Sequence, residues 1–391
     1  MKYAVAKRTQ HFTLPKQWAS MRAAQGMEAA TGRKVIHLEK GDYQGEEFRL
    51  PPHVAAAAYD GLRDGDVRYD PGPGLPELRE AIAAEVSARG RPTLPEEVVV
   101  TAGAKHSLQI ALLTLLDEGD GLIFPNPGYP PDEVWANYAG ARVMHTPLTP
   151  GSWQYDLGSL ARLLEGDDVK CLVINTPQRP NGELVTDNEE IARLVRPKRG
   201  LVTLSDEIFS HIVYDDKRHV SISAVAGMAD RTILIDTFSK TYAMTGWRIG
   251  WTVAPAPLAQ RFSMFLQDSI TNVATFVQRA ALAAMTGPQD WVEEKLMRLQ
   301  RKRNAMVSGL NSIAGIRCPT PSGSFYVFAD ISQTGMTAEE FTRRLLHEQQ
   351  IAVVAGTAFG SQGQGFVRLT FAVPDQDIER GVAGIAAMLG G

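Results

Sequence analysis

The sequence is poor in cysteine, has no long apolar run and has no excess of one charge. Cys171 and Cys318 lie far apart and lack the spacing of metal ligands, which argues against a disulfide framework or a zinc site. We expect both to be small buried residues, and we expect no metal. No apolar stretch is long enough to cross a bilayer, and residues 1–18 lack an apolar core of signal-peptide length. We therefore expect no membrane partner and a cytoplasmic location.

The charge balance argues against nucleic acid as a partner. The chain carries 40 basic and 44 acidic residues, a formal net charge of -4, without a basic stripe that could follow a phosphate backbone. What is present is an ordinary globular composition, 44% hydrophobic and 21% charged, over 391 residues. That length is sufficient for two domains of ordinary size.

Short apolar runs alternate with longer periodic stretches, which is typical of βα units packed as a mostly parallel sheet flanked by helices. The expected strands are residues 97–101, 121–124, 170–175, 201–207 and 232–237. The expected helices between them include residues 104–116 and 188–194. Two proline-rich stretches, 125–131 and 176–182, follow strands directly, so we expect loops there. The sequence therefore predicts an α/β fold.

The alternation of short apolar runs and helices ends after about residue 287. A charged helix is expected at residues 291–310, followed by strands near 324–330 and 365–370. We expect residues 47–287 to form the large domain and residues 288–391 a smaller α+β domain, to which residues 1–46 contribute. No internal repeat or Ser/Gly-rich linker separates these parts, so we expect them to pack closely.

Two polar residues follow neighbouring expected strands. Asp206 closes one strand and Lys240 follows the next, and ligands collect at the carboxyl ends of strands in open α/β sheets. A buried ion pair between them is the alternative. Gly103 and Ala104 lie at a strand-to-helix turn, where backbone N–H groups and the helix dipole favour an anion, although a glycine there can also be only a turn.

Further donors suggest that the anion is a phosphate. Arg248 follows Lys240 by eight residues, and Thr237 and Ser239 carry hydroxyl groups. Pyridoxal phosphate needs a lysine for its Schiff base, a phosphate cradle and a carboxylate beside its pyridine nitrogen. Tyr129, in the expected loop PNPGYPP, could stack on the cofactor ring, or it could be a turn tyrosine packed on the core.

With these residues, and above all with SKTYAMTGWRIG at 239–250, the chain resembles the fold type I pyridoxal-phosphate enzymes. It is most similar to the class I/II aminotransferases related to aspartate aminotransferase, from about residue 38 to 387. The resemblance implies that Lys240 forms the Schiff base and that Asp206 faces the pyridine nitrogen. It places Tyr129 against the ring. It puts these residues at the phosphate: Gly103, Ala104, Lys105, Thr237, Ser239 and Arg248.

Three more residues match positions of this family. Tyr69 matches a tyrosine that crosses a dimer interface to the neighbour's cofactor phosphate, which implies a homodimer with shared active sites; locally it would mean only a turn before a helix. Arg368 matches the arginine that binds the substrate α-carboxylate, and an arginine within an apolar strand pattern needs a buried anionic partner in any case. Gly41 matches a position where backbone approaches that carboxylate.

Two departures from the family pattern concern the cofactor's phenolic oxygen. Arg179, in TPQRPNG, stands where the family has an asparagine that hydrogen-bonds this oxygen, and Phe209 stands where it has a tyrosine that donates to it. If Arg179 points inward, its charge could take over that role; if it points outward, it is a solvated loop arginine. A shift of register would instead bring Asn181 to the oxygen.

The leading hypothesis is an aminotransferase for an L-amino acid, with Lys240 as covalent anchor and general base. Arg179 and Phe209 motivate the alternative, which is elimination, cyclisation, decarboxylation or oxidation of an amino acid on the same fold. A cofactor-binding sensor without turnover is a third possibility. Glu46 and Glu47, with Tyr43 near the expected entrance, would suit a basic amino acid, or they could lie in an exposed loop.

Overall fold

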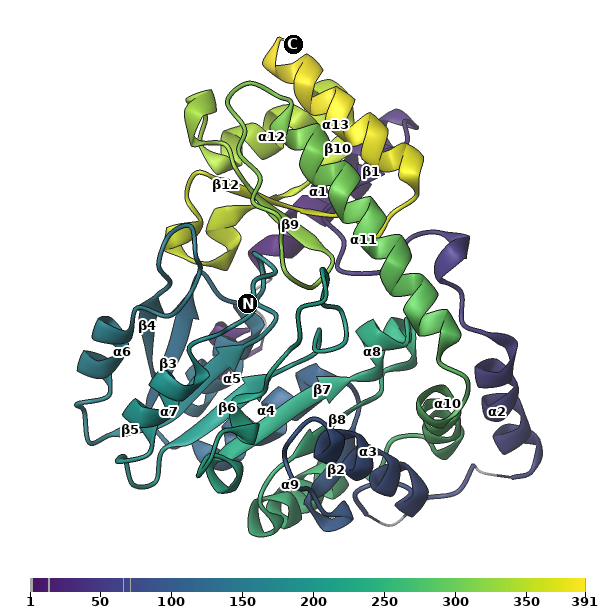
Figure 1. Ribbon diagram of the computed structural model, residues 1–391, viewed down its shortest axis with the longest axis vertical. Coiled ribbons are helices and arrows are strands. Elements are labelled where there is room, and N and C mark those ends of the chain that lie inside the picture. Colours follow the sequence, from purple (N-terminus) through teal and green to yellow (C-terminus); the bar gives the residue numbers. More distant parts are fainter. Residues whose placement is uncertain (1–2, 13–14, 66, 71, 391) are drawn as a thin grey trace.

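The computed structural model describes residues 3–12, 15–65, 67–70 and 72–390. Its largest sheet within these residues has seven strands in the order β2-β8-β7-β6-β5-β3-β4 and fills the lower half of Figure 1. The five strands from β7 to β4 are parallel, whereas β8 is antiparallel to both β2 and β7. The bounds are β2 (Val98–Thr101), β3 (Gly121–Asn126), β4 (Arg142–Pro147), β5 (Val169–Asn175), β6 (Val202–Asp206), β7 (Thr232–Thr237) and β8 (Gly250–Val253).

Helices cover both faces of this sheet, which explains why its inner strands are continuous apolar runs. In β2 the side chains alternate between the faces, since Val98 and Val100 belong to one hydrophobic cluster and Val99 to another. The cluster around Val99 includes α4 (Ala104–Leu115) and α9 (Ala256–Ile270). The opposite cluster is formed with α2 (Pro52–Arg63), α3 (Pro76–Ala88) and α10 (Thr275–Thr286).

The other helices near this sheet are α5 (Pro131–Ala139), α6 (Leu157–Leu163), α7 (Asn188–Val195) and the short α8 (Phe238–Thr241). β6 and β7 end at Asp206 and Thr237, so the turn of α8 that contains Lys240 begins directly at the carboxyl edge of the sheet. This edge faces the upper layer of the molecule (Figure 1).

The upper layer combines the C-terminal part of the chain with a piece of its N-terminal part (Figure 1). A three-stranded antiparallel sheet contains β11 (Val354–Ala355), β12 (Phe366–Thr370) and β9 (Tyr326–Asp330). β1 (Ile36–His37) pairs in parallel with β10 (Ile351–Ala352). The helices of this layer are α1 (Lys16–Thr31), α11 (Asp290–Asn311), α12 (Ala338–Gln349) and α13 (Asp375–Leu389). The domain boundaries after residues 46 and 287 remain a prediction. The first and last predicted domains begin and end at residues 1, 2 and 391, which lie outside the described residues.

The expectation of a loop over residues 125–131 is wrong at both ends. β3 continues to Asn126, and α5 already begins at Pro131. Pro125 is tolerated because β3 pairs with β5 only as far as Ile123, so its missing N–H breaks no hydrogen bond on that side. Pro131 is tolerated because the first residue of a helix needs no N–H partner within the helix.

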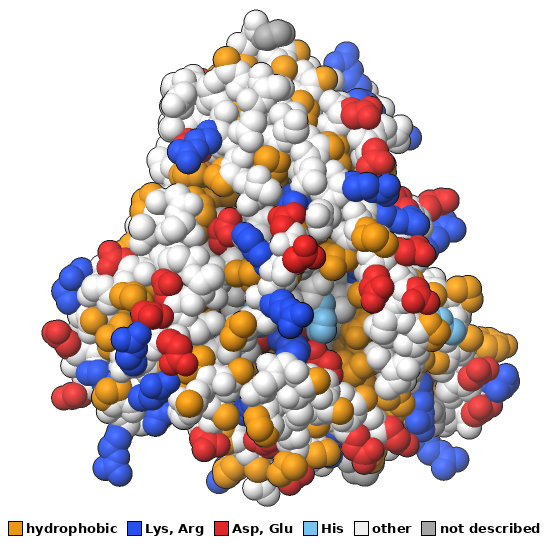
Figure 2. All heavy atoms as spheres, in the orientation of Figure 1, with side chains coloured by type: hydrophobic (Ala, Val, Ile, Leu, Met, Phe, Trp, Pro, Cys, Tyr) orange, Lys and Arg blue, Asp and Glu red, His pale blue; other side chains and the backbone are white. Residues whose placement is uncertain are grey.

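On the face of the molecule seen in Figure 2, acidic and basic side chains lie intermixed. Among the described residues, no helix is both long and apolar enough to traverse a bilayer.

Candidate active site

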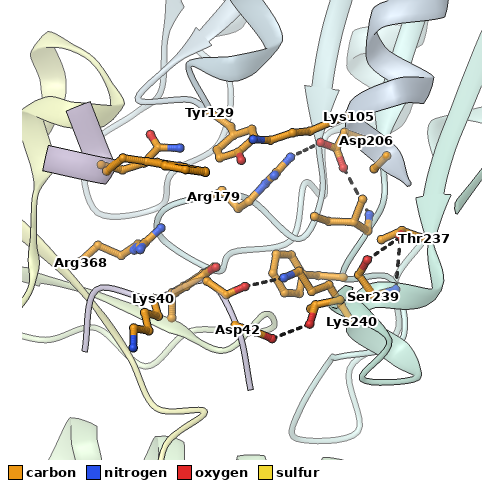
Figure 3. A pocket seen from close by; sticks show the side chains of 18 of the residues that line it. Lys40, Asp42, Lys105, Tyr129, Arg179, Asp206, Thr237, Ser239, Lys240 and Arg368 are labelled. Carbon is orange, nitrogen blue, oxygen red and sulfur yellow. Dashed lines mark hydrogen bonds and ion pairs between the residues drawn. The ribbon is translucent and has the colours of Figure 1, made fainter. Parts of the chain in front are cut away.

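A cavity of about 600 Å³ lies at the carboxyl edge of the large sheet, beneath the upper layer. Its walls come from the ends of β6 and β7, the start of α4, the loops after β3 and β5, residues near 40, and β12. It brings together most of the residues predicted from the sequence (Figure 3). The predicted residues that line it are Gly41, Ala104, Lys105, Tyr129, Arg179, Asp206, Phe209, Thr237, Ser239, Lys240, Arg248 and Arg368.

Lys240 extends from α8 into this cavity. Its Nζ donates a hydrogen bond of 2.6 Å to the carbonyl oxygen of Gly41. The pKa of Lys240 is lowered to about 7, mainly by burial; the charge of Asp42 opposes this shift, and the charges of Arg179, Arg368 and Arg248 contribute to it. An amine with this pKa is partly neutral near pH 7, which is the form that attacks a carbonyl.

The start of α4 and Arg248 form one corner of the cavity. Gly103, the residue before α4, has φ +86° and ψ 166°, and a Cβ placed there would lie 2.7 Å from Nη2 of Arg248. Only glycine therefore allows the guanidinium to lie against the start of the helix. Thr237 caps α8 by accepting from the Ser239 N–H at 3.2 Å. The corner combines a cation, two hydroxyl groups and the N–H groups of the first turn of α4, which is the donor set for a phosphate.

At the end of β6, the guanidinium of Arg179 lies over the ring of Tyr129 and points at the carboxylate of Asp206 (Figure 3). The carboxylate of Asp206 is fully buried and accepts from Nη2 of Arg179. The guanidinium carbon of Arg179 lies 3.8 Å from the centroid of the Tyr129 ring. Burial raises the pKa of Asp206, and the charge of Arg179 opposes that shift.

Arg179 therefore points inward, with 7% of its surface exposed. The alternative of a solvated loop arginine is wrong. Asn181 does not line the cavity, since its side-chain amide donates to Oε1 of Gln178 at 2.8 Å.

Phe209 contributes an apolar wall without a hydroxyl group. Its ring contacts Phe325 and Tyr326, with centroid distances of 5.1 and 5.8 Å, and the Nζ of Lys240 lies 6.0 Å from its centroid.

Arg368 lies on β12 at the opposite side of the cavity from Asp206 (Figure 3). It is 4% exposed, donates to the carbonyl oxygen of Glu39, and lies over the ring of Tyr326 at 4.3 Å. A Cβ at Gly41 would lie 2.8 Å from Oη of Tyr326, so a side chain at position 41 would push this phenol away. The corner offers a desolvated guanidinium beside exposed backbone, which suits a carboxylate.

Some predicted residues do not lie at this cavity. Tyr69 is 84% exposed and does not line it within this chain. Glu46 pairs with Arg49 and Glu47 with Lys302, and neither carboxylate lines the cavity. The proposal of an acidic entrance for a basic amino acid therefore loses its structural basis.

Sequence reasoning missed three residues around Lys240. Asp42 lines the cavity and accepts from Thr245 at 2.7 Å. Tyr326 supports Arg368, as described above. Lys295, on α11, is 5% exposed and donates to the carbonyl oxygen of Thr241, and burial lowers its pKa to about 7. Only Asp42 gave a sequence signal, since it adjoins Gly41.

Within the part of the chain that the structure describes, no group of three or more His, Cys, Asp or Glu residues could hold a metal ion. Cys171 and Cys318 are free and buried.

Comparison with known proteins decides the family. The model of the family described as aminotransferase class I and II matches residues 33–385. The chain belongs to this family. Its relatives include an aspartate aminotransferase of Pyrococcus abyssi, 34% identical over 90% of each chain. They also include aromatic-amino-acid aminotransferase 2 of Thermococcus litoralis, 32% identical over 91% of this chain and 90% of the relative.

Solved structures give the same family. The aspartate aminotransferase of Rhizobium meliloti matches with a TM-score of 0.94 and 28% identity over 99% of both chains. The resemblance drawn from the sequence and the predicted fold class are thereby confirmed. The protein is an aminotransferase, and the enzymes of this family depend on pyridoxal phosphate.

Proposed function

We propose that this chain binds pyridoxal phosphate covalently through Lys240 and transfers the amino group of an L-amino acid to a 2-oxo acid. The observation that carries the proposal is the position of the Lys240 amine, which lies in the cavity with a pKa lowered to about 7. Such an amine is both a nucleophile and a base near neutral pH.

The residues present fit the cofactor. The glycine at position 103, which does not itself line the cavity, lets the guanidinium of Arg248 lie against the start of α4, where a Cβ would be 2.7 Å from Nη2. Asp206 supplies a buried carboxylate at the end of β6, and Tyr129 supplies a ring face. Thr237, Ser239, Arg248 and the N-terminal turn of α4 would hold the phosphate, Asp206 the ring nitrogen and Tyr129 the ring face.

When bound, pyridoxal phosphate supplies a carbonyl that condenses with amines and a ring that accepts electrons. The chain's own groups do the rest. Arg368 binds and orients the substrate α-carboxylate. The amine of Lys240 would take the α-proton and return it to the carbon of the cofactor's former carbonyl, across the substrate nitrogen, because a neutral amine with this pKa can do both near pH 7. Phe209 and Tyr326 exclude water from one wall.

Phe209 also favours a second candidate function. It removes a hydroxyl donor that would stabilise the cofactor's phenolic oxygen, so the electronic properties of the cofactor are expected to differ from those in its relatives. Elimination, cyclisation, decarboxylation or oxidation of an amino acid would use the same Lys240, Asp206 and Arg368.

A homodimer is also proposed. Tyr69 is 84% exposed, and Tyr59 and Val67 near it in the chain are 66% and 69% exposed. Large apolar side chains exposed in one segment fit a surface that a second copy covers. Tyr69 would then reach the second copy's phosphate site. The cytoplasmic location stays a prediction.

The test is an anaerobic single turnover with individual L-amino acids, followed by the visible spectrum and by analysis of products. Transamination predicts loss of the visible band with one equivalent of 2-oxo acid. Release of ammonia, or a band that persists until oxygen is added, would instead favour the second candidate. Lys240→Ala is expected to abolish the band, whereas Lys40→Ala, the matched control at another cavity lysine, should retain it.

A further inference from the structure

Arg179 is held firmly in its position by its own loop. Its main-chain N–H donates to Oδ1 of Asn175 at 2.6 Å, and the side-chain amide of Asn175 donates to the carbonyl oxygen of Asp206 at 3.0 Å. The N–H of Thr176 donates to the same carbonyl oxygen at 3.0 Å. The loop after β5 is thus fixed to the end of β6, which aims the side chain of Arg179 at the carboxylate of Asp206 (Figure 3).

The guanidinium of Arg179 has the two contacts that a protonated pyridine ring needs. It donates to the buried carboxylate of Asp206, and its central carbon lies over the Tyr129 ring, 3.8 Å from the ring centroid. A guanidinium is planar, positively charged and weakly hydrated, and in these three respects it resembles a pyridinium ring. One carboxylate and one aromatic face thus have two planar cations as possible partners.

We propose that Arg179 competes with the pyridoxal phosphate ring for Asp206 and Tyr129, so that the guanidinium must leave them before the ring can bind fully. The inference rests on the proposed function, since it needs the cofactor in this cavity. The main chain of Arg179 stays tied to Asn175, so the displaced side chain swings within the cavity. Its charge then lies beside the bound ring rather than in solvent.

Two opposite effects follow from this competition. The apparent affinity for pyridoxal phosphate is reduced by the fraction of molecules in which Arg179 holds Asp206. Without cofactor, the same contact stabilises the fold, because a buried carboxylate without a cation is costly. Removal of the guanidinium should therefore strengthen cofactor binding and weaken the cofactor-free fold. A residue with a purely structural role would weaken both.

The experiment titrates the cofactor-free full-length chain with pyridoxal phosphate and follows the visible band. Arg179→Met, which removes the guanidinium without adding a hydrogen-bond donor to the cofactor, is expected to bind about tenfold to hundredfold more tightly than the wild type, the range that one charge-assisted hydrogen bond represents. Its melting temperature without cofactor should be lower than that of the wild type. Arg179→Lys, which keeps the charge but not the planar face, should lie between them. Arg193→Met, at an exposed arginine of α7, is the matched control and should leave both quantities unchanged.

Other results of the titration overturn the inference. Equal or weaker binding by Arg179→Met would mean that the guanidinium holds the cofactor or is indifferent to it. If Arg179→Met does not fold, Arg179→Lys decides alone, and it must bind more tightly than the wild type. Absence of a visible band in every protein, the wild type included, would remove the proposed function and the inference together. If the wild type binds the cofactor and the variants bind it with the same affinity, only the inference fails and the proposed function stands.

Discussion

Gly103→Ala tests whether the start of α4 and Arg248 form a phosphate site. The backbone at position 103, with φ +86° and ψ 166°, lies in a region that is almost restricted to glycine and costs other residues about 1–3 kcal/mol. The new Cβ would also lie 2.7 Å from Nη2 of Arg248, well inside contact distance, so the guanidinium has to move. We expect the free energy of unfolding to fall by about 1–3 kcal/mol.

The specific consequence concerns the phosphate. Loss of one charge-assisted hydrogen bond costs about 1.5–3 kcal/mol, which corresponds to roughly tenfold to hundredfold in affinity. We expect Gly103→Ala to lose that factor for pyridoxal phosphate but not for pyridoxal, which lacks the phosphate, with both measured by titration of the cofactor-free chain. Gly246→Ala is the matched control, because a Cβ there meets nothing within 4 Å. If Gly103→Ala binds both ligands like the control, the assignment of this corner to a phosphate is refuted.

Two further predictions concern buried cations. Lys240 and Lys295 have pKa values lowered from 10.5 to about 7 in the folded chain, so between these values the unfolded chain binds more protons and the free energy of unfolding rises with pH. Urea denaturation of the cofactor-free protein should show that Lys295→Met flattens this rise; an unchanged slope would mean that Lys295 titrates normally. Arg368→Lys should raise KM for amino acids by about tenfold to hundredfold, because it loses paired hydrogen bonds to a carboxylate, and should leave the visible band intact. An unchanged KM in steady-state assays would remove Arg368 from the substrate site.

The inner strands could be predicted from the sequence because burial on both faces makes them continuous apolar runs. β5 and β7 come nearest to this pattern, whereas β6 buries Thr203 and Ser205 between its apolar residues. β4 is not predicted, because it lies at the sheet edge and mixes exposed and buried residues. β8 is not predicted either, because it lies in the segment after Lys240 that was interpreted by its motif and not by its apolar pattern. The two-residue strands β1, β10 and β11 are too short for any periodicity.

The site was predictable where chemistry follows directly on a strand. Asp206 and Lys240 satisfy that rule, because parallel strands deliver their ends to one edge of the sheet. Lys295 and Tyr326 could not be found in this way, since tertiary packing brings them from α11 and β9. The direction of Arg179 was also open, because it depends on the hydrogen bonds of Asn175 rather than on any local preference.

The carbonyl oxygens of Glu39 and Gly41 set the spacing between two cations of the cavity. The oxygen of Gly41 receives the amine of Lys240, and the oxygen of Glu39, two residues earlier, receives the guanidinium of Arg368. The separation of these two cations is therefore set by the main chain from Glu39 to Gly41, which spans at most about 3.3–3.6 Å per residue, rather than by side-chain size. Exchange of the side chains at Glu39 and Lys40 should leave this spacing unchanged, because main-chain groups set it. Deletion of a single residue between Glu39 and Gly41 would change the distance between the Lys240 amine and the Arg368 guanidinium.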